Sequence, residues 1–377
     1  MSDMTALTQE RDKLLVDLYE GRIPKRVPIV NLLPLEFAIQ YAGKDLKEVQ
    51  WNNTILEEIA DKVCQDFPSD IMPLFNIRYP SIYKVLGARN FVMGSNGFIQ
   101  HPEVEGLDVA DYDALIASPY DCIVEKVLPK LYAELDTGDS MKKAFALAKG
   151  FKAFNDEFAN QAIIAAKLTA KYGYSSIPFN TGFCEAPFDF LSDQLRGFKG
   201  IAFDVRRIPD KVQAAVEVLT PLMIKMGMPP LSVPYGATFI PLHLAPYLRT
   251  KDFEKLYWPS FKKLIEGLKE AGVTAFIFAE QDWMRYLDYL IELPENTRIW
   301  FEYGDPKLAK AKLGKRHILT GFYPLSLLKT GTKMECIDKA KELIDIMAPG
   351  GKYFFSFDKI PVTADSVNLE NFRAVSE

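Results

Sequence analysis

Glu280 is the residue best placed for chemistry in this sequence, because it ends the strongly apolar run AFIFA and is followed by Gln281 and Asp282. A carboxylate in such a place is costly to bury without a partner. Burial would raise its pKa and suit it to general acid or base work, whereas a nearby cation or metal would keep it ionised. We expect Glu280 to be catalytic. The alternative is an ion pair with Arg285 or a rim lysine that does no chemistry.

His243 is the expected neighbour of Glu280. It ends the fourth of eight predicted strands and Glu280 lies at the end of the fifth, so adjacent strands would bring the two together. The pair could relay a proton or hold a divalent metal. His101 and His317 are weaker candidates, since one falls in a predicted insertion and the other begins a strand at the opposite end. A histidine satisfied by backbone groups is the alternative reading of His243.

Other polar residues lie at or just after predicted strand ends. They are Asn31, Asn76, Asn180, Cys184, Glu185, Asp282, Glu302, Asp305, Tyr323 and Asp358. We expect Asp305 to start a turn or cap a helix, because Pro306 follows it. Cys184 could be a nucleophile, but no His or Lys neighbours it in sequence to lower its pKa, so packing or substrate contact is favoured. The predicted substrate contacts are Asn31, Asn76, Asn180, Cys184, Asp282 and Tyr323.

The elements that must position these residues alternate along the chain. Apolar runs rich in Val, Ile, Phe and Tyr follow helical segments, which is typical of parallel strands joined by crossover helices. The predicted strands are 26–31, 69–76, 174–183, 231–244, 273–281, 297–304, 317–324 and 352–359. Eight strands predict an α/β protein of the (β/α)8 TIM-barrel class. In such barrels the reacting groups come from the C-terminal ends of the strands.

A single domain over residues 1–377 is the simplest organisation, since no Pro-, Gly- or Ser-rich linker interrupts the series. We expect an N-terminal helix over 1–23 and a mostly helical insertion or cap over 77–172, after the second strand. Residues 252–271 place six apolar side chains on one helix face, and Thr332 with Glu335 has capping-box spacing.

Composition excludes several classes of protein. Hydrophobic residues make up 48% of the chain and charged residues 25%, as in a globular protein with a large core. The net charge of -5 and the lack of Lys/Arg runs argue against nucleic acid as a partner. The charged N-terminal segment has neither a signal-peptide stretch nor a membrane span, so we expect a cytoplasmic protein. The four cysteines form no short pairs, which argues against disulfides and structural zinc.

Five strings in this order resemble the uroporphyrinogen decarboxylase (URO-D) superfamily, and they are closest to its methyltransferase-like branch. They are EAPFDFLSDQLRGFKGIAFDVRRIPDKV, FEKLYWPSFKKLIEGLKEAG, FAEQDWMRYLDYLIELP, GTKMECIDKAKELID and GGKYFFSFDKIPVTADSVNLENF. The resemblance runs from about residue 24 to the end. It implies one of two chemistries: decarboxylation of porphyrinogen acetates, or methyl transfer to or from a corrinoid on a separate protein.

The residues distinguish these chemistries. The decarboxylases have an Arg-rich motif after the first strand, where this sequence reads VNLLPLEFAIQYAG without an arginine. Thiol-methylating members bind zinc through a His-x-Cys motif and a second Cys; here Phe278 and Glu280 stand at the first two positions and Asp358 lies close to the third. The resemblance therefore puts such a zinc site in doubt, although His243, Glu280 and Asp358 could form a harder, oxygen-rich metal site.

The resemblance thus implies a methyltransferase acting between a small methylated substrate and a corrinoid cofactor, of the methylcobalamin type. The sequence has no Asp-x-His-x-x-Gly motif of the kind that holds cobalamin, so the corrinoid should arrive on a partner protein. Glu280 would act as acid or metal ligand beside His243. The alternatives are a decarboxylase for a substrate with few carboxylates, and a binding barrel without catalysis.

Overall fold

The computed structural model describes residues 3–51, 53–76, 78–231 and 233–377. Residues 1 and 2 of the predicted N-terminal helix, residue 77 of the predicted insertion and residue 232 of the fourth predicted strand lie outside the described residues. The predicted α/β fold with parallel strands is confirmed. Five parallel strands form the central sheet in the order β5-β6-β7-β8-β9. These strands are β5 Gly182–Phe183, β6 Ala237–Leu242, β7 Thr274–Asp282, β8 Arg298–Tyr303 and β9 Ile318–Gly321.

The remaining predicted strands are short in the structure. The first predicted range, 26–31, forms no ladder, and β1 Leu33–Pro34 lies just after it and pairs with β2 Leu74–Phe75 in parallel. The last predicted strand makes only isolated bridges. These bridges join Ile29 to Phe355, Leu319 to Tyr353 and Tyr323 to Phe357. Single backbone hydrogen bonds connect the other neighbours, for example from Ser175 N to Asp70 O at 2.9 Å. Pro28 and Pro73 interrupt the first two predicted ranges, and a proline has no N–H to give to a ladder.

Two apolar clusters divide the strand residues between them. An inner cluster contains alternate residues, such as Phe239 on β6 and both Phe276 and Phe278 on β7. Their sequence neighbours, such as Ile240 and Ile277, belong to a larger outer cluster that packs under the helices. Successive side chains of a strand point to opposite faces, so the two clusters mark the two faces of the sheet. Apolar burial on both faces is typical of parallel strands covered by helices.

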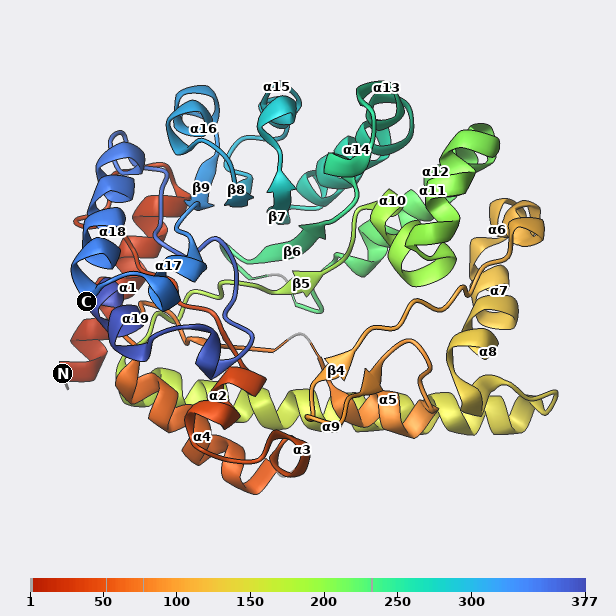
Figure 1. Cartoon of the computed structure of the whole chain (residues 1–377), viewed down its shortest axis with the longest axis horizontal. Helices are drawn as coiled ribbons and strands as arrows, with labels where there is room; N and C mark the ends of the chain where they lie inside the picture. The colour runs from red at the N-terminus through yellow and green to blue at the C-terminus, as the bar shows by residue number, and fades with distance from the viewer. Residues whose placement is uncertain (1–2, 52, 77, 232) are drawn as a thin grey trace.

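The helices after the strands cover the outer face of the sheet (Figure 1). They are α10 Pro187–Phe190, α11 Phe198–Arg207, α12 Pro209–Met226, α13 Thr250–Asp252, α14 Trp258–Glu270, α15 Leu287–Leu290, α16 Pro306–Leu313, α17 Leu325–Thr330, α18 Lys333–Met347 and α19 Leu369–Ser376. The six apolar residues predicted to face inward over 252–271 are all buried. The predicted capping box of Thr332 and Glu335 is present at the start of α18.

The predicted helix over 252–271 is not continuous, since the π-helical turn η6 Phe253–Tyr257 separates α13 from α14. Pro259 explains the wider turn, because it cannot donate the hydrogen bond that an α-helix would form back to Lys255. None of the described helices is both long enough and apolar enough to cross a membrane.

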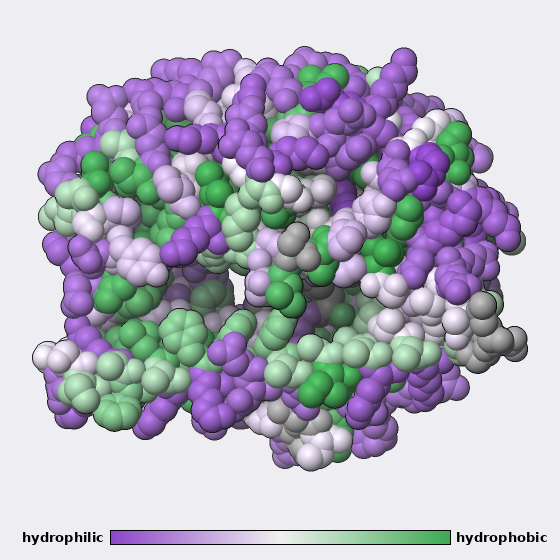
Figure 2. All heavy atoms as spheres, turned by 180° about the vertical axis from the view of Figure 1, so that it is seen from behind, coloured by the Kyte–Doolittle hydropathy of each residue, from purple (hydrophilic) through white to green (hydrophobic). Residues whose placement is uncertain are grey.

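The chain between β2 and β5 is mostly helical and lies along the edge of the molecule opposite α14–α16 (Figure 1). Its helices are α5 Pro80–Leu86, α6 Tyr112–Ala117, α7 Pro119–Cys122, α8 Leu128–Leu131 and the 33-residue α9 Ser140–Tyr172. A small antiparallel hairpin of β3 Val92–Met93 and β4 Ile99–Gln100, which the sequence did not suggest, lies among them. Seen from behind, the molecule is hollowed above this edge, and hydrophobic residues are visible in the hollow (Figure 2).

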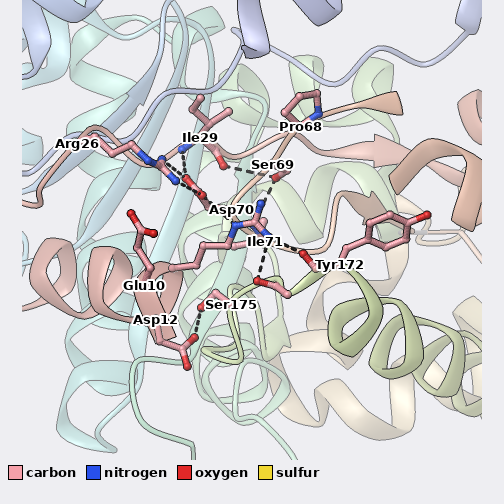
Figure 3. A network of polar contacts seen from close by, with 12 residues as sticks. Glu10, Asp12, Arg26, Ile29, Pro68, Ser69, Asp70, Ile71, Tyr172 and Ser175 are labelled. Carbon is pink, nitrogen blue, oxygen red and sulfur yellow. Dashed lines mark hydrogen bonds and ion pairs between the residues drawn. The ribbon is translucent and has the colours of Figure 1, made fainter. Parts of the chain in front are cut away.

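The N-terminal part of the chain is held by a polar network around Asp70 (Figure 3). The predicted N-terminal helix is α1 Asp3–Tyr19, followed in the chain by α2 Leu35–Tyr41, α3 Leu46–Val49 and α4 Asn53–Asp66. Asp70 accepts two hydrogen bonds from Arg26, at 2.6 and 2.7 Å, and pairs with Arg11 at 3.3 Å. Arg11 also donates to the carbonyl oxygens of Tyr172 and Gly173. One buried carboxylate thereby links α1, the segment before β1 and the end of α9.

Candidate functional site

Three side chains from different elements form a row at the C-terminal ends of β6 and β7. Asp193, on the π-helical turn η4 Leu191–Arg196, is hydrogen-bonded to Nδ1 of His243. On the other side of the ring, Nε2 of His243 lies 3.4 Å from Oε1 of Glu280. The prediction that the ends of adjacent strands bring His243 and Glu280 together is therefore correct. An imidazole between two carboxylates can hold a proton and can pass one from ring nitrogen to carboxylate.

The backbone at the end of β7 sets the direction of the Glu280 side chain. The pairing register between β7 and β8 shifts between Ala279 and Asp282, as in a β-bulge. Within this irregularity Gln281 has a φ of 63°, an uncommon conformation for a residue other than glycine. Its N–H donates to Glu302 at 2.8 Å. Bulges redirect side chains next to functional sites, and here the bulge directly follows the candidate residue.

His243 is positively charged in this environment. Burial opposes the charged ring, but the hydrogen bonds to Asp193 and Glu280 raise the pKa of His243 to about 12. Beneath it, the buried carboxylate of Asp189 accepts hydrogen bonds from the backbone N–H groups of His243 and Leu244, at 3.1 and 2.9 Å. Burial raises the pKa of Asp189. Asp189 thus fixes the backbone that carries the imidazole.

Glu185, predicted only as a polar residue after a strand end, is a further functional candidate. It is 5% exposed, and its Oε1 accepts a hydrogen bond from Nε2 of Gln194 at 2.9 Å. Its Oε2 is buried and has no partner among the described residues. Burial first, and then the charge of Asp193, raises the pKa of Glu185 to about 8, so the group is mostly protonated at pH 7. The sequence feature that could have indicated a functional role for Glu185 is its position just after β5, between Cys184 and Ala186.

These groups face a cavity of about 630 Å³, a volume typical of small-molecule sites. Glu185, Asp193, His243 and Glu280 line it on the side of the strands. On the opposite side the segment between β2 and β5 contributes polar and aromatic groups: Arg78, Tyr83, Asn90, Phe91, His101 and Glu103. Phenylalanines complete the wall: Phe183, Phe198, Phe239 and Phe278. The cavity therefore combines an acid–base row with aromatic rings.

Three of the predicted substrate contacts have structural contacts instead. Asn31 is buried and donates to Pro68 O and to Ser376 Oγ. Tyr323 is buried and donates to the carbonyl oxygen of Cys336. Cys184 is fully buried, and burial raises the pKa of its thiol, so it remains protonated. None of Asn31, Tyr323 and Cys184 lines the cavity that holds His243.

The other three predicted contacts also lie outside this cavity. Asn76 and Asn180 line a larger cavity of about 820 Å³ beside α1 and α9. No titratable side chain is among the described residues that line that larger cavity. Asp282 is exposed, and its side chain accepts a hydrogen bond from the N–H of Met284 at 2.8 Å. As expected, Asp305 caps a helix, accepting from Lys307 N and Leu308 N at the start of α16.

Asp358 does not join His243 and Glu280. Its carboxylate accepts a hydrogen bond from Leu325 N at 3.0 Å, and burial raises its pKa to about 6. Within the described ranges no group of three His, Cys, Asp or Glu side chains is arranged to hold a metal ion. The donor set thus does not fit a zinc site of the thiol-methylating type.

Fold and site together define an α/β protein with an acid–base row at the C-terminal ends of parallel strands, where enzymes of this architecture place their chemistry. The family model described as uroporphyrinogen decarboxylase (URO-D) matches residues 148–375, more than half of the chain, and the protein belongs to this family. It also has the fold of a methyltransferase from Methanosarcina mazei, with a TM-score of 0.61 and 15% identity over 97% of this chain and 96% of that one. No curated protein matches the sequence.

Proposed function

We propose that this protein is a methyltransferase that moves a methyl group between a small methylated substrate and a corrinoid carried on a separate protein. The observation that carries the proposal is the row of Asp193, His243 and Glu280 on the wall of a small-molecule cavity. Membership of the URO-D family and the fold shared with a methyltransferase support the same reading.

The proposal includes a closed (β/α)8 barrel around this site. Its support is the five-stranded sheet, the β1–β2 pair and the isolated bridges that connect the last predicted strand to both of its neighbours. The inner apolar cluster supports closure as well, because it collects residues from the segments of all the predicted strands except the third, together with Leu15 and Leu18 of α1. Such an arrangement packs the barrel interior and leaves the strand ends as the mouth.

Each residue of the row has a distinct task in this reaction. A reduced corrinoid supplies the nucleophile that accepts a methyl group. Glu280 faces the substrate, and His243 beside it holds the proton nearest to the reacting end. Asp193 orients the imidazole through Nδ1, as carboxylates commonly do for functional histidines.

Decarboxylation of a polycarboxylate is the less favoured reaction. A substrate with many carboxylates needs several cationic partners. Among the described lining residues Arg78 is the one arginine, and no lysine accompanies it, whereas Glu103, Glu185, Asp193 and Glu280 contribute four carboxyl groups. Glu185 is mostly protonated at pH 7, and the imidazolium of His243 is already paired with Asp193 and Glu280. Arg78 is therefore the one free cationic group among the described lining residues, which is too few for such a substrate.

The test is a methyl-transfer assay with free cob(I)alamin standing in for the corrinoid protein, followed by loss of the cob(I)alamin absorbance. With a panel of small methyl donors, wild-type protein should accelerate the loss for at least one donor. Glu280→Gln should lower that rate at least tenfold. Glu292→Gln, on the surface beside Lys262, is the matched control and should leave it unchanged. Full activity of Glu280→Gln would remove Glu280 from the proposal, and carbon dioxide from porphyrinogens without methyl transfer would replace the function.

A further inference from the structure

The charged groups around the cavity favour a cationic ligand. Four carboxyl groups line the cavity, of which Glu185 is mostly protonated at pH 7, against the guanidinium of Arg78 and the imidazolium of His243. The imidazolium is already matched on both sides by Asp193 and Glu280. Desolvation is the largest effect on His101 and lowers its pKa, so this ring is neutral at pH 7. Buried Asp189, directly behind His243, adds further negative potential when it is ionised. An anion would be disfavoured near the acid–base row.

Aromatic rings in the cavity wall can bind a cation together with the carboxyl groups. Phe91 is stacked between Tyr83 and His101, with centroids 4.6 and 4.4 Å apart, and all three rings line the cavity. Both faces of Phe91 are therefore covered, and a cation can meet the outer face of Tyr83 or of His101. Phe239 and Phe278 lie on the strand side of the same cavity. The face of an aromatic ring attracts a cation within about 6 Å of its centroid, and methylated ammonium groups are commonly bound in this way.

Two buried polar atoms in the cavity wall are unsatisfied in the described part of the chain. They are Oε2 of Glu185 and Oδ1 of Asn90, and their residues are 5% and 3% exposed. Buried polar atoms are normally paired, so unpaired ones in a cavity wall indicate where a ligand binds. An oxygen without a donor is well suited to a positively charged ligand, which the oxygen's partial or full negative charge stabilises.

We propose that the methylated substrate of this cavity is an onium cation, either a methylated ammonium or a methylated sulfonium ion, bound between Glu185, Glu280 and the Tyr83–Phe91–His101 stack. This inference rests on the proposed function and specifies its substrate class.

The chemistry of the transfer agrees with this class. The bond from the methyl carbon to nitrogen or sulfur breaks, and its electron pair stays on the heteroatom, which leaves as a neutral amine or sulfide. The reduced corrinoid of the proposed function supplies the electron pair of the new bond and is oxidised by two electrons. No proton is required, since the leaving group carries no negative charge. His243 can therefore remain paired with both of its carboxylates throughout.

Binding tests the inference without any corrinoid. Choline and 3,3-dimethyl-1-butanol have the same shape and differ in the charge of the central atom, so calorimetry with the two compares charge alone. Choline should bind the full-length protein at least tenfold more tightly than the neutral alcohol. Tetramethylammonium and trimethylsulfonium chlorides then distinguish the two kinds of onium ion. Equal binding of choline and the alcohol, or no binding of any cation, would overturn the inference.

Two variants locate the cation. Tyr83→Leu keeps an apolar side chain but removes an outer ring of the stack, so it should weaken choline binding severalfold and leave the alcohol unchanged. Glu185→Gln should also weaken choline binding, with Glu292→Gln as the surface control. A bound cation should ionise Glu185, so wild-type protein should release a proton on binding choline at pH 7. The release appears as a buffer-dependent heat that Glu185→Gln lacks. Unchanged choline binding in both folded variants would exclude this position.

The outcomes separate this inference from the proposed function. Selective choline binding without methyl transfer to reduced corrinoid would support the cation site and contradict the methyltransferase. Methyl transfer from a neutral donor, with no cation bound, would support the methyltransferase and contradict the cation site.

Discussion

The Oε1 atom of Glu280 lies 3.4 Å from Nε2 of His243, and the two residues reach this contact from adjacent strands. Each stands an even number of positions beyond a residue of the inner apolar cluster, Phe239 on β6 and Phe278 on β7. Side chains at even spacing along a strand share a face. The contact therefore follows from alternation as well as from strand order, and it places both groups over the inner cluster, where the cavity lies.

Asp193→Asn should lower the pKa of His243 from about 12, because the hydrogen bond to Asp193 is the largest effect that favours the charged ring. The asparagine keeps the shape but provides no charge, so the imidazole loses part of its preference for the protonated form. Proton NMR titration of the His243 ring measures the shift. Asp288→Asn, which removes a surface pair with Lys312, should leave the titration unchanged. An unaltered His243 titration in Asp193→Asn would mean that Asp193 does not control the ring.

Strand order was sufficient to predict the contact between His243 and Glu280. The rule that functional residues lie at the C-terminal ends of strands, however, also predicted substrate contacts that do not line the cavity. Asn31 and Tyr323 also end predicted strands, yet both point to the outer face, and Tyr323 bonds to Cys336 of α18. Val30 and Leu32, on either side of Asn31, belong to the inner cluster. Alternation was therefore already in the sequence and would have excluded Asn31.

Asp193 could not be predicted by this reasoning, for a different reason. Asp193 lies on η4, a π-helical turn, and such turns have no sequence period that predicts which side chain faces the strands. The opposite wall depends on how the segment after β2 folds back. Arg78, Phe91 and His101 line the same cavity as His243 and Glu280, which are far away in the sequence. No local sequence pattern predicts such a contact.

The stability of the protein should fall as pH rises from about 5 to 8, and Glu185 should account for part of the fall. Its pKa is raised from 4.5 to about 8 by burial, so between these values the folded state binds a proton that the unfolded state lacks. The stabilisation from this proton is complete below pH 4.5 and is lost as pH passes through 8. Urea unfolding of wild type and Glu185→Gln at pH 5, 6, 7 and 8 should show the variant gaining relative stability with each step. A constant difference would contradict the raised pKa.

Asp70→Asn should destabilise the fold by about 2 kcal/mol, because the partly buried guanidinium of Arg11 loses its carboxylate and keeps only the carbonyl oxygens of Tyr172 and Gly173. Asp70 also accepts from the N–H of Ile29 at 2.8 Å, so the segment before β1 would lose an anchor. Chemical unfolding measures the change. Asp288→Asn, on the surface, should cost about 1 kcal/mol or less. Choline binding should persist in folded Asp70→Asn, since Asp70 lies at the start of its strand and not among the residues that line the cavity.

Gly321→Ala should be among the most damaging small substitutions in the chain. Gly321 ends β9 with a φ of 94°, which an alanine rarely adopts, and an added Cβ would lie 2.1 Å from the carbonyl oxygen of Phe301 on β8. Either β9 must move away from β8 or the peptide must turn, and both changes break the pairing of Phe301 with Gly321. We expect a loss of more than about 2 kcal/mol, since strain of 1–3 kcal/mol adds to the lost contact. Thermal unfolding should show a much lower midpoint, whereas Gly138→Ala, with no atom within 4 Å of its added Cβ, should unfold close to wild type. Equal midpoints for the two variants would contradict this prediction, because they would mean that the contact between β8 and β9 tolerates a side chain at position 321.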